Sequence, residues 1–384
     1  MRPLLLHLSH TEIPRDSRIL KELAALADLP DVQVVGVGVR GRDEGSQSAS
    51  NPEIEIVTLT LLSKRLTFLP RPMRYAANLV ELIWKMLAQG RRYRPTVVHC
   101  HDTMVLPIGW LFSKLWGTLL VYDAHELESD RNGQSVLLSW FTLKIEQFCW
   151  SQVNLLVTVS NSIIQWYKEH LGAKPAVLVL NSPIIESPTS LVPVHENYFH
   201  NQFGIPVQAP VFIYVGIIGR GRGIHLILDA FADPTMTAHV VFLGFGEMED
   251  EVRRFAKKFP NIHYHPSVPH AQVVSHVRQA DVGLCLIERV SLSDYLCLPN
   301  KLFEYTMAGL PVLGSDFPEI AGYLNRYAAG STCPLTVEGI REGVRRHVDN
   351  PQDRLDVDLS EVAWPAQADR LRTAYERLMS SPRS

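Results

Sequence analysis

The stretch Leu298-Pro-Asn-Lys-Leu-Phe-Glu-Tyr-Thr-Met-Ala-Gly-Leu-Pro-Val-Leu-Gly-Ser-Asp316 decides the fold of the second half of the chain. It predicts a helix with Pro299 in its first turn, a glycine stop, and then a buried strand. Lys301 and Glu304 are three residues apart, so they share one helical face near the positive end of the dipole. A cation beside backbone N–H groups suits a phosphate, and a carboxylate one turn later suits sugar hydroxyls. An ordinary amphipathic helix with both side chains solvated explains the spacing equally well.

Working outward, apolar strand-like runs alternate with helical patterns on both sides of one break in the chain. The runs are continuous rather than alternating, which predicts parallel sheets covered by helices on both faces. We expect strands at 4–8, 32–39, 54–57, 97–100, 119–122, 155–159, 177–180, 211–215, 239–243, 262–264, 282–286 and 311–313, with helices such as 17–29, 75–89 and 161–170 between them.

The break predicts two domains of the α/β class, each a doubly wound Rossmann-like sheet, facing across a cleft at the carboxyl ends of the strands. The first domain covers 1–180, and a linker rich in Pro, Ser, His and Asn covers 181–209. The second domain covers 210–365. The last segment, 366–384, is a helix that we expect to pack back on the first domain.

Composition excludes several classes of protein. The 384 residues are 46% apolar and 20% charged, as in soluble globular proteins, and the net charge of −3 gives no global attraction to nucleic acid. The five cysteines are scattered without a CxxC pair, which predicts a reducing, cytoplasmic compartment and no structural zinc. The short apolar run at 4–8 is a strand rather than a signal peptide. The apolar segment 104–122 contains Pro, Lys and Gly, so we expect a helix and a strand there instead of a membrane span.

Six segments carry a resemblance to a known family. They are Val97-Val-His-Cys-His-Asp102, Val121-Tyr-Asp-Ala-His-Glu126, Val157-Thr-Val-Ser160, Tyr214-Val-Gly-Ile-Ile-Gly-Arg-Gly-Arg-Gly-Ile224, Leu243-Gly-Phe-Gly-Glu247 and the block 298–319. In this order they resemble the GT-B-fold glycosyltransferases of family four, over nearly the whole chain. The resemblance implies a retaining enzyme of hexosyltransferase type that uses a nucleotide-sugar donor and needs no cofactor and no metal.

The loop after 211–215 has a chemistry of its own. Its glycines, including Gly216, Gly219 and Gly221, let backbone N–H groups approach a ligand closely, and the following helix adds positive potential. No GK[ST] follows and no GxGxxG is present, which counts against a Walker loop and a dinucleotide-dependent dehydrogenase. By the resemblance, Arg222 is the second member of a basic pair that holds the donor diphosphate. Ile217 occupies the first position, and Arg220 is either its substitute or a solvated cation of the loop.

The family's donor motif has two glutamates separated by seven residues. Glu304 matches the second, which the resemblance assigns to the ribose, whereas Leu296 stands at the first. A subgroup with the sequence Pro-Asn-Lys-Leu-Phe-Glu-Tyr shares this difference, and there Lys301 would supplement the diphosphate contacts. Asp294 and Asn300 are candidates for the donor sugar, and both are equally explained as loop or capping residues.

Polar residues follow two strands of the first domain. The resemblance places His125 against the donor sugar; the alternative is a histidine that only orders its loop. His101 and Asp102 either bind acceptor hydroxyls or cap the helix that begins near Val105. The acids Asp123, Glu126 and Glu128 lack a convincing metal-ligand pattern. The resemblance implies no protein nucleophile, so that Arg222, Lys301 and helix-end amides stabilise the leaving diphosphate while His125 faces the sugar.

The segment 64–94 has eight basic residues and a single acid, Glu81. Tyr75, Leu79, Leu82, Ile83, Met86 and Leu87 form an apolar helical stripe within it, with Trp84 nearby. This pattern suits an anionic membrane surface, where lipid-linked acceptors are found, although a core-packed helix with a solvated cationic face is the alternative.

These observations together predict a glycosyltransferase that transfers sugar from a UDP- or GDP-linked donor to a glycan or lipid-linked acceptor, in surface polysaccharide or glycolipid synthesis. We expect it in the cytoplasm, peripheral to the inner face of a membrane, with no nucleic-acid partner. A nucleotide-sugar epimerase on the same fold and a non-catalytic glycosyltransferase-like subunit are the alternatives.

Overall fold

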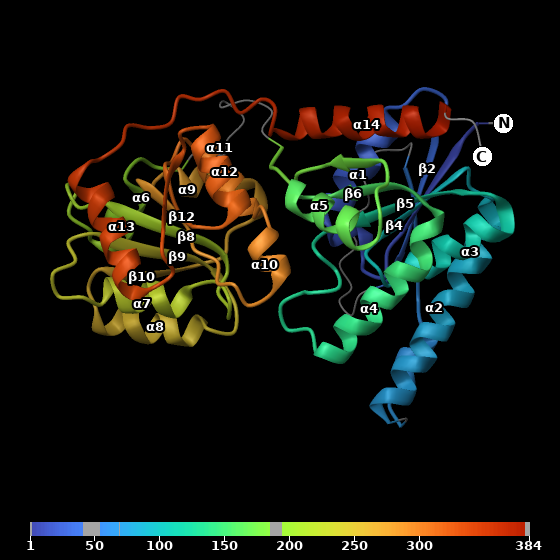
Figure 1. The fold of residues 1–384 in the computed structure, drawn as a ribbon. Coiled ribbons are helices and arrows are strands. Elements are labelled where there is room, and N and C mark those ends of the chain that lie inside the picture. The colour runs from blue at the N-terminus through green and yellow to red at the C-terminus, as the bar shows by residue number, and fades with distance from the viewer. Residues whose placement is uncertain (1, 41–53, 69, 185–193, 381–384) are drawn as a thin grey trace. The chain divides into compact units, whose positions relative to one another are not determined.

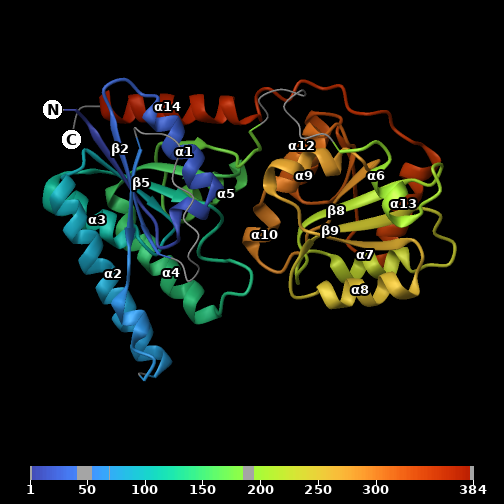
Figure 2. The same cartoon turned by 180° about the vertical axis from the view of Figure 1, so that it is seen from behind.

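The computed structural model describes residues 2–40, 54–68, 70–184 and 194–380. The chain divides into two compact units, which Figure 1 and Figure 2 show as ribbons from opposite sides. Unit 1 comprises Met1–Leu180 together with Pro365–Ser384, and unit 2 comprises Asn181–Trp364. Each unit is built on its own parallel sheet, so each buries its own core.

The sheet of unit 1 has seven parallel strands in the order β3-β2-β1-β4-β5-β6-β7. The strands are β1 (Leu4–Leu8), β2 (Gln33–Val39), β3 (Ile54–Leu59), β4 (Val97–His101), β5 (Leu119–Ala124), β6 (Val153–Thr158) and β7 (Ala176–Leu178). The chain order reverses between β1 and β4. In open α/β sheets the carboxyl edge at such a reversal is where ligands bind.

Helices cover both faces of this sheet. They are α1 (Ser17–Ala27), α2 (Arg71–Tyr93), α3 (Leu106–Trp116), α4 (Val136–Cys149), α5 (Asn161–His170) and α14 (Trp364–Ser380), with short 3-10 turns at Ile13–Arg15, Leu62–Arg65 and Trp150–Gln152. Gly109 of α3 packs on Cys100, so closely that a Cβ there would lie 2.3 Å from the sulfur. His99, whose side chain points the other way from Cys100, bonds to Tyr375 of α14. The helices α3 and α14 therefore lie on opposite faces of β4.

Unit 2 has six parallel strands in the order β10-β9-β8-β11-β12-β13. The strands are β8 (Val211–Ile217), β9 (His239–Phe245), β10 (Ile262–Pro266), β11 (Val282–Cys285), β12 (Val312–Ser315) and β13 (Gly330–Cys333). The helices are α6 (Tyr198–Phe203), α7 (Ile224–Phe231), α8 (Glu249–Lys258), α9 (His270–Val277), α10 (Leu292–Leu296), α11 (Asn300–Met307), α12 (Pro318–Arg326) and α13 (Val337–Asp349). Buried aromatic and aliphatic residues of β8, β9 and α7 form its core.

The predicted fold class is confirmed, since both sheets are parallel and of the Rossmann-like kind. The expected strand 4–8 and helix 161–170 match β1 and α5 at both ends. Two details were wrong. Pro299 is the extended residue that precedes α11 rather than a residue of its first turn, and β13, which has no apolar run, was not predicted. The segment 104–122 folds as α3 and β5, and none of the described helices has the length and apolarity needed to cross a membrane.

Candidate functional site

A row of polar side chains crosses one face of the unit 1 sheet. His7 on β1 lies beside His99 on β4, and His101 lies beside Asp123 on β5 in the strand register. Because residues two apart on a strand point to the same face, His99 and His101 share that face. All four side chains are fully buried. The strands therefore align a polar row that runs to the carboxyl edge of the sheet.

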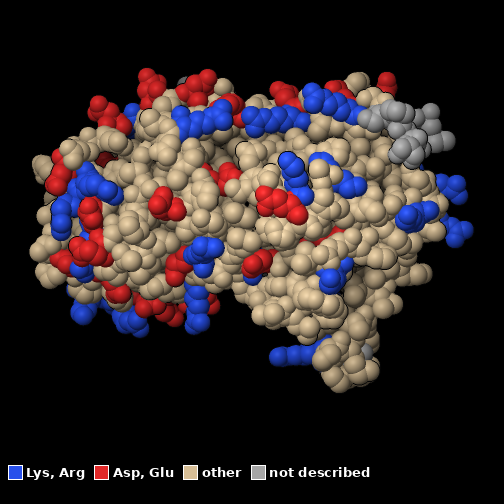
Figure 3. Space-filling view, viewed as in Figure 1, with Lys and Arg blue, Asp and Glu red and all other residues tan. Residues whose placement is uncertain are grey.

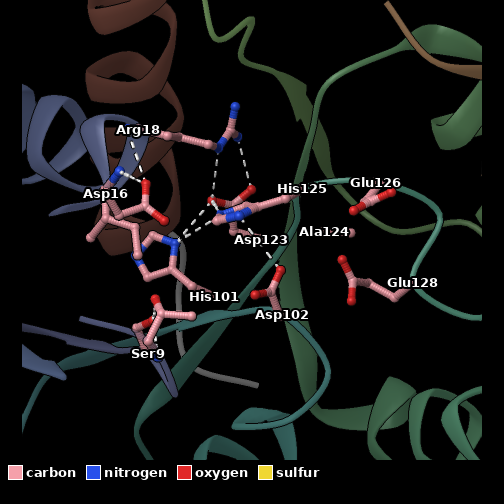
Figure 4. Close-up of polar contacts among 12 residues, drawn as sticks. Ser9, Asp16, Arg18, His101, Asp102, Asp123, Ala124, His125, Glu126 and Glu128 are labelled. Carbon is pink, nitrogen blue, oxygen red and sulfur yellow. Dashed lines mark hydrogen bonds and ion pairs between the residues drawn. The ribbon is translucent and has the colours of Figure 1, made fainter. Parts of the chain in front are cut away.

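Asp123 is the centre of this row, and Figure 4 shows the side chains that point toward it. Arg18 of α1 donates from Nη2 to Oδ1 over 2.9 Å. His101 Nδ1 and His125 Nε2 both donate to Oδ2, over 3.1 Å and 2.9 Å. Burial alone would raise the pKa of Asp123, but Arg18 and His125 hold it well below its ordinary value. Asp123 is thus a buried carboxylate whose charge two cations balance.

His125 is the one member of this network that reaches solvent, with 19% of its side chain exposed. Burial would lower its pKa, but the charges of Asp123 and Asp102 outweigh that effect and raise it to about 10. Asp102 lies 3.5 Å from Nδ1 on the far side of the ring from Asp123. At neutral pH, His125 is therefore an imidazolium cation held between two carboxylates, which fixes the orientation of its ring.

His101 does not match its predicted role. Its side chain is fully buried, so it is not open to an acceptor hydroxyl, which was one of the two roles that the sequence left open. Its Nδ1 donates to Asp123, so its Nε2 accepts from His7 over 3.0 Å. Burial lowers its pKa, which keeps the ring neutral. His101 therefore supports Asp123 from behind instead of facing a ligand.

Asp102 remains at the surface of the same loop, with 14% of its side chain exposed and a left-handed backbone at φ +68°. It does not cap α3, because the residue at that cap, Val105, has no side-chain bond to the helix. Its carboxylate lies 3.7 Å from His10 and 3.5 Å from His125. His10, Asp102 and His125 are thus partly exposed polar groups that lie together at this edge.

The buried row also brings possible metal ligands within reach of one another, namely His7, His99, His101, Asp123 and Glu22 of α1. Their geometry does not suit an ion. The ring of His99 stacks on those of His7 and His101 at centroid distances of 4.4 and 4.3 Å, with interplanar angles of 22° and 24°. Lone pairs of stacked rings run nearly parallel and cannot converge at the 2.0–2.1 Å that zinc requires. The guanidinium of Arg18 also lies beside the shared carboxylate. The row is better described as a hydrogen-bonded network.

The acids Glu126 and Glu128 are not part of that network. Both pair with Arg131, at 3.2 and 3.0 Å. Burial raises the pKa of Glu128 well above its ordinary value, and the negative charge of Asp102 raises it further. These two carboxylates therefore stabilise the loop that follows β5.

In unit 2 the end of β8 and the loop after it have the backbone that their glycines predict. Gly216 and Gly221 have φ values of +116° and +76°, which favour glycine. Gly244 lies so close that a Cβ there would meet the Gly216 carbonyl oxygen at 1.9 Å. At the end of the loop, the N–H of Gly223 donates to the carboxylate of Glu288 over 3.1 Å. Glu288 thus already occupies the N–H group of the residue that precedes α7.

Lys301 lies on the first turn of α11 with its ammonium nitrogen 3.8 Å from the centroid of the Tyr214 ring. That nitrogen is buried and has no hydrogen-bond partner among the described residues. The Tyr214 hydroxyl donates to the carbonyl of Ile217 over 2.6 Å, so the same side chain ties the glycine loop to the lysine. A buried ammonium without a hydrogen bond is costly unless an anion completes the site.

Arg222 is the second cation of this site. Its guanidinium lies 3.5 Å from the carboxylate of Asp294, which is buried at the start of α10. Burial raises the pKa of Cys285 to about 12, while the charges of Lys301 and Arg222 act on that thiol in the opposite direction. Both cations therefore lie near the end of β11. Asp294, which we had considered for the donor sugar, instead holds Arg222.

The remaining predicted residues of unit 2 lie around these two cations. Arg220 is 89% exposed and pairs with Glu247 at 3.9 Å, so the structure places it in solvent. Ile217 is also exposed. Glu304 is half-buried one turn after Lys301 on α11, whereas Asn300 is exposed at the start of that helix. Gly219 is buried within the loop.

Sequence reasoning missed several residues that organise these sites: Arg18, His7, His99 and Tyr375 in unit 1, and Tyr214 and Glu288 in unit 2. Tyr214 lay inside a quoted motif, yet nothing in its spacing links it to Lys301. The other contacts join residues far apart in sequence, as Arg18 and Asp123 do.

Comparisons with known proteins agree with this architecture. Residues 17–183 match the family described as "Glycosyl transferase 4-like domain", and residues 196–361 match "Glycosyl transferases group 1". A D-inositol 3-phosphate glycosyltransferase from Corynebacterium aurimucosum is 26% identical over 317 residues, which are 74% of this chain and 72% of the relative.

Solved structures show the same fold at low identity. Sucrose-phosphate synthase from Thermosynechococcus elongatus is 16% identical with a TM-score of 0.70, covering 98% of this chain and 94% of its own. HepE from Anabaena in complex with UDP-glucose is 13% identical with a TM-score of 0.67, covering 98% of each chain. Together the two family matches cover both units, and the chain belongs to the GT-B-fold glycosyltransferases of family four.

Proposed function

We propose that this protein is a retaining glycosyltransferase of hexosyltransferase type, which moves a sugar from a UDP- or GDP-linked donor to a glycan or lipid-linked acceptor. The observation that carries the donor half is the buried, unbonded ammonium of Lys301 beside Arg222. Two cations near one strand end, below a loop of glycines, suit a diphosphate. HepE in complex with UDP-glucose is an example of the same fold holding a nucleotide-sugar.

In the reaction, Lys301 and Arg222 would neutralise the charge that develops on the diphosphate as the sugar leaves. Asp294 holds the Arg222 guanidinium and Tyr214 holds the Lys301 ammonium, so both cations are oriented before the donor arrives. The carboxylate of Glu304 would bind the ribose. Since no protein nucleophile is implied, the acceptor hydroxyl attacks on the face that the diphosphate leaves, and the departing phosphate takes its proton.

In unit 1 the imidazolium of His125 would face the donor sugar. Its ring is oriented by Asp123 and Asp102, and its charge persists at neutral pH. A fixed cation at that place can hydrogen-bond a sugar hydroxyl and cannot act as a general base. Asp102 is the adjacent group available to an acceptor hydroxyl. No metal and no further cofactor take part in this scheme.

The acceptor half of the proposal places the enzyme in surface polysaccharide or glycolipid synthesis, in the cytoplasm at the inner face of a membrane. The basic segment 64–94 supports peripheral contact with anionic lipid, because its single acid, Glu81, is already paired with Lys85 at 2.7 Å. The relative from Corynebacterium aurimucosum is named for D-inositol 3-phosphate.

The proposal is tested by incubating the pure protein with UDP- and GDP-linked hexoses and measuring nucleotide release and the sugar products. We expect release with one donor, strongly reduced in Lys301→Ala and kept in Lys258→Ala. Lys258 is a matched control because its ammonium also lies over an aromatic ring, that of Phe259, on the surface of α8. Conversion of the sugar without release would support an epimerase, and neither change with any donor would support a non-catalytic subunit.

Retention is tested separately by NMR of the anomeric carbon once an acceptor is found. We expect the product to keep the anomeric configuration of the donor. An inverted product would overturn the retaining part of the proposal and leave the donor site untouched.

A further inference from the structure

The helix α4 is built with its polar side inward. Its buried residues are Thr142, Glu146 and Cys149. Its exposed residues include Val136, Leu137, Leu138, Trp140, Phe141 and Phe148, each at least half exposed. A surface helix normally buries an apolar stripe and turns its polar face outward. The pattern of α4 is the reverse.

Hydrogen bonds of Glu146 explain why α4 does not rotate about its axis to bury its apolar side. Its Oε1 accepts from the hydroxyls of Tyr122 and Tyr167, at 2.6 and 2.5 Å, and all three side chains are buried. Rotating α4 to cover its aromatic residues would break both bonds and take the buried carboxyl group of Glu146 away from the two hydroxyls that it accepts from. The apolar side of α4 therefore faces outward because the hydrogen bonds of Glu146 to Tyr122 and Tyr167 fix its polar side against unit 1.

The first turn of α4 shows what kind of surface would cover it. Val136, Leu137 and Leu138 are consecutive and exposed by 88, 66 and 54%. Successive residues of a helix point about 100° apart, so these three cover roughly 200° of its circumference. A packed protein partner covers a stripe of about 100°. A medium that surrounds the helix end, such as the interior of a lipid leaflet, covers all three.

The helix α2 also has an exposed apolar side. Met73, Val80 and Trp84 are spaced for one side of the helix and are exposed by 57, 66 and 68%, whereas Leu82 and Met86 face the core. The apolar stripe predicted from the sequence therefore includes residues of both sides of α2: Leu82 and Met86 are buried, whereas Tyr75 and Leu79 are exposed. Basic residues lie in and just before the first turn of α2, at Lys64, Arg65, Arg71 and Arg74, and Lys144 lies on α4.

The two helices share one end of unit 1. Because α2 runs back to the start of β4, its first turns lie at the carboxyl edge of the sheet, and α4 begins at that edge after the loop that follows β5. Both first turns lie at the lower side of unit 1 in Figures 1 and 2. In Figure 3 the surface there is mostly uncharged and interrupted by a few basic groups. His125 and Asp102 lie on loops at the same edge.

We propose that the first two turns of α4 and the outward face of α2 insert into the surface of an anionic bilayer. Aliphatic and aromatic groups enter the leaflet, and the basic residues meet the lipid phosphates. Lys144 lies 5.9 Å from the Trp140 ring, a pairing suited to the depth of the headgroups. The docking stands on α2 and α4 alone; only the conclusion that it brings a lipid-linked acceptor to His125 rests on the proposed function.

The test is flotation of the pure full-length protein with vesicles, either equal parts phosphatidylglycerol and phosphatidylcholine or phosphatidylcholine alone. We expect the protein to float with the anionic vesicles. The double variant Leu137→Asn with Trp140→Ser should bind roughly tenfold more weakly or worse, as expected when large apolar groups are lost from the leaflet. Val207→Asn removes an equally exposed apolar residue of unit 2 and should bind as the wild type does. Charge reversal at Arg71 and Arg74 should weaken binding to the anionic vesicles alone.

Two results would overturn the inference. The first is equal flotation of the wild type and the Leu137–Trp140 variant. The second is a lipid-independent dimer, seen by sedimentation equilibrium, that the same variant dissolves, because the face would then bind a second copy of the chain. Calorimetry with UDP and GDP on each variant separates this inference from the proposed function: lost flotation with intact nucleotide binding concerns the lipid surface alone. Unchanged thermal unfolding of the variants confirms that they fold.

Discussion

The polar sites of the two units differ in how far their charges are already paired. In unit 1, Arg18, Asp123 and His125 pair with one another in the interior, and His125 alone of these reaches solvent. In unit 2, the buried ammonium of Lys301 lies over an aromatic ring and has no hydrogen bond to any residue that the structure describes. The charges of the first site are paired within the protein, whereas the ammonium of the second site is not.

This difference predicts which substitutions affect folding and which affect binding. A buried charge pair loses about 3–5 kcal/mol when one partner is removed, because the other charge stays buried and uncompensated. A cation that has no partner in the unliganded protein contributes little to folding and contributes fully when an anion binds. Variants in unit 1 should therefore destabilise the fold, and variants in unit 2 should weaken nucleotide binding.

The largest effect is expected for Asp123→Asn. The change leaves the guanidinium of Arg18 and the imidazolium of His125 without their shared carboxylate, at a cost of about 3 kcal/mol or more in the free energy of unfolding. Urea denaturation at neutral pH measures it. Glu22→Gln is the matched control in the same cluster. Burial and the charge of Asp123 raise the pKa of Glu22 to about 8, so its neutral form is already favoured and the change should cost under about 1 kcal/mol. Equal losses for both variants would contradict the paired-charge account.

The next largest effect is expected for Lys301→Ala, which should weaken nucleotide binding without lowering the free energy of unfolding. The unliganded variant should unfold at the same urea concentration as the wild type or at a higher one. Its affinity for a nucleoside diphosphate should fall by about 1.5–3 kcal/mol, the value of a hydrogen bond to a charged group. Calorimetry measures the affinity, with Lys258→Ala as the unaffected control. A destabilised variant with normal nucleotide affinity would show that Lys301 is structural.

The charge of His125 predicts a dependence of stability on pH. Its folded pKa of about 10 lies above the ordinary 6.5, so the folded chain keeps a proton that the unfolded chain releases. The stability from this proton is complete below pH 6.5 and is lost as the pH rises through 10. Within that window the free energy of unfolding should fall by up to about 1.4 kcal/mol per pH unit more steeply in the wild type than in His125→Gln. Parallel curves from urea denaturation at several pH values would show that His125 is not a buried cation.

The smallest effect is expected at Tyr214. Tyr214→Leu removes the ring face under the Lys301 ammonium and should weaken nucleotide binding by about 0.5–2 kcal/mol. Tyr214→Phe keeps that face and removes only the bond to the Ile217 carbonyl, so its loss should be smaller. A larger loss for the phenylalanine variant would mean that the loop contact, and not the ring, positions Lys301.

The same comparison explains how much could be predicted from the sequence. Parallel strands such as β1 and the helix α5 follow from local apolar patterns, so their bounds were predictable. The glycine loop and Lys301 were found because they lie in short ordered motifs. The network of unit 1 was not, because it joins Arg18 to Asp123 and His99 to Tyr375, pairs separated by 105 and 276 residues.

Two features of unit 1 depend on contacts between distant segments. A ligand contact was one of the two roles considered for His101, because it ends a strand, yet the register with β5 and the contact with His7 place it inside. The outward apolar side of α4 could not be predicted either, because the anchor at Glu146 depends on tyrosines from β5 and α5. Local sequence patterns predict which elements form, and long-range partners decide which side of each element faces inward.

The most direct test of the account is a calorimetric series on the wild-type protein with UDP, UMP and uridine, repeated with GDP, GMP and guanosine. We propose that Lys301 and Arg222 bind the diphosphate of the donor. The nucleoside diphosphate of one base should therefore bind at least tenfold more tightly than its nucleoside. The affinity of the monophosphate should lie between the two or close to that of the nucleoside. Equal binding of diphosphate and nucleoside, or no binding by either series, would contradict the claim that unit 2 is an unfilled diphosphate site.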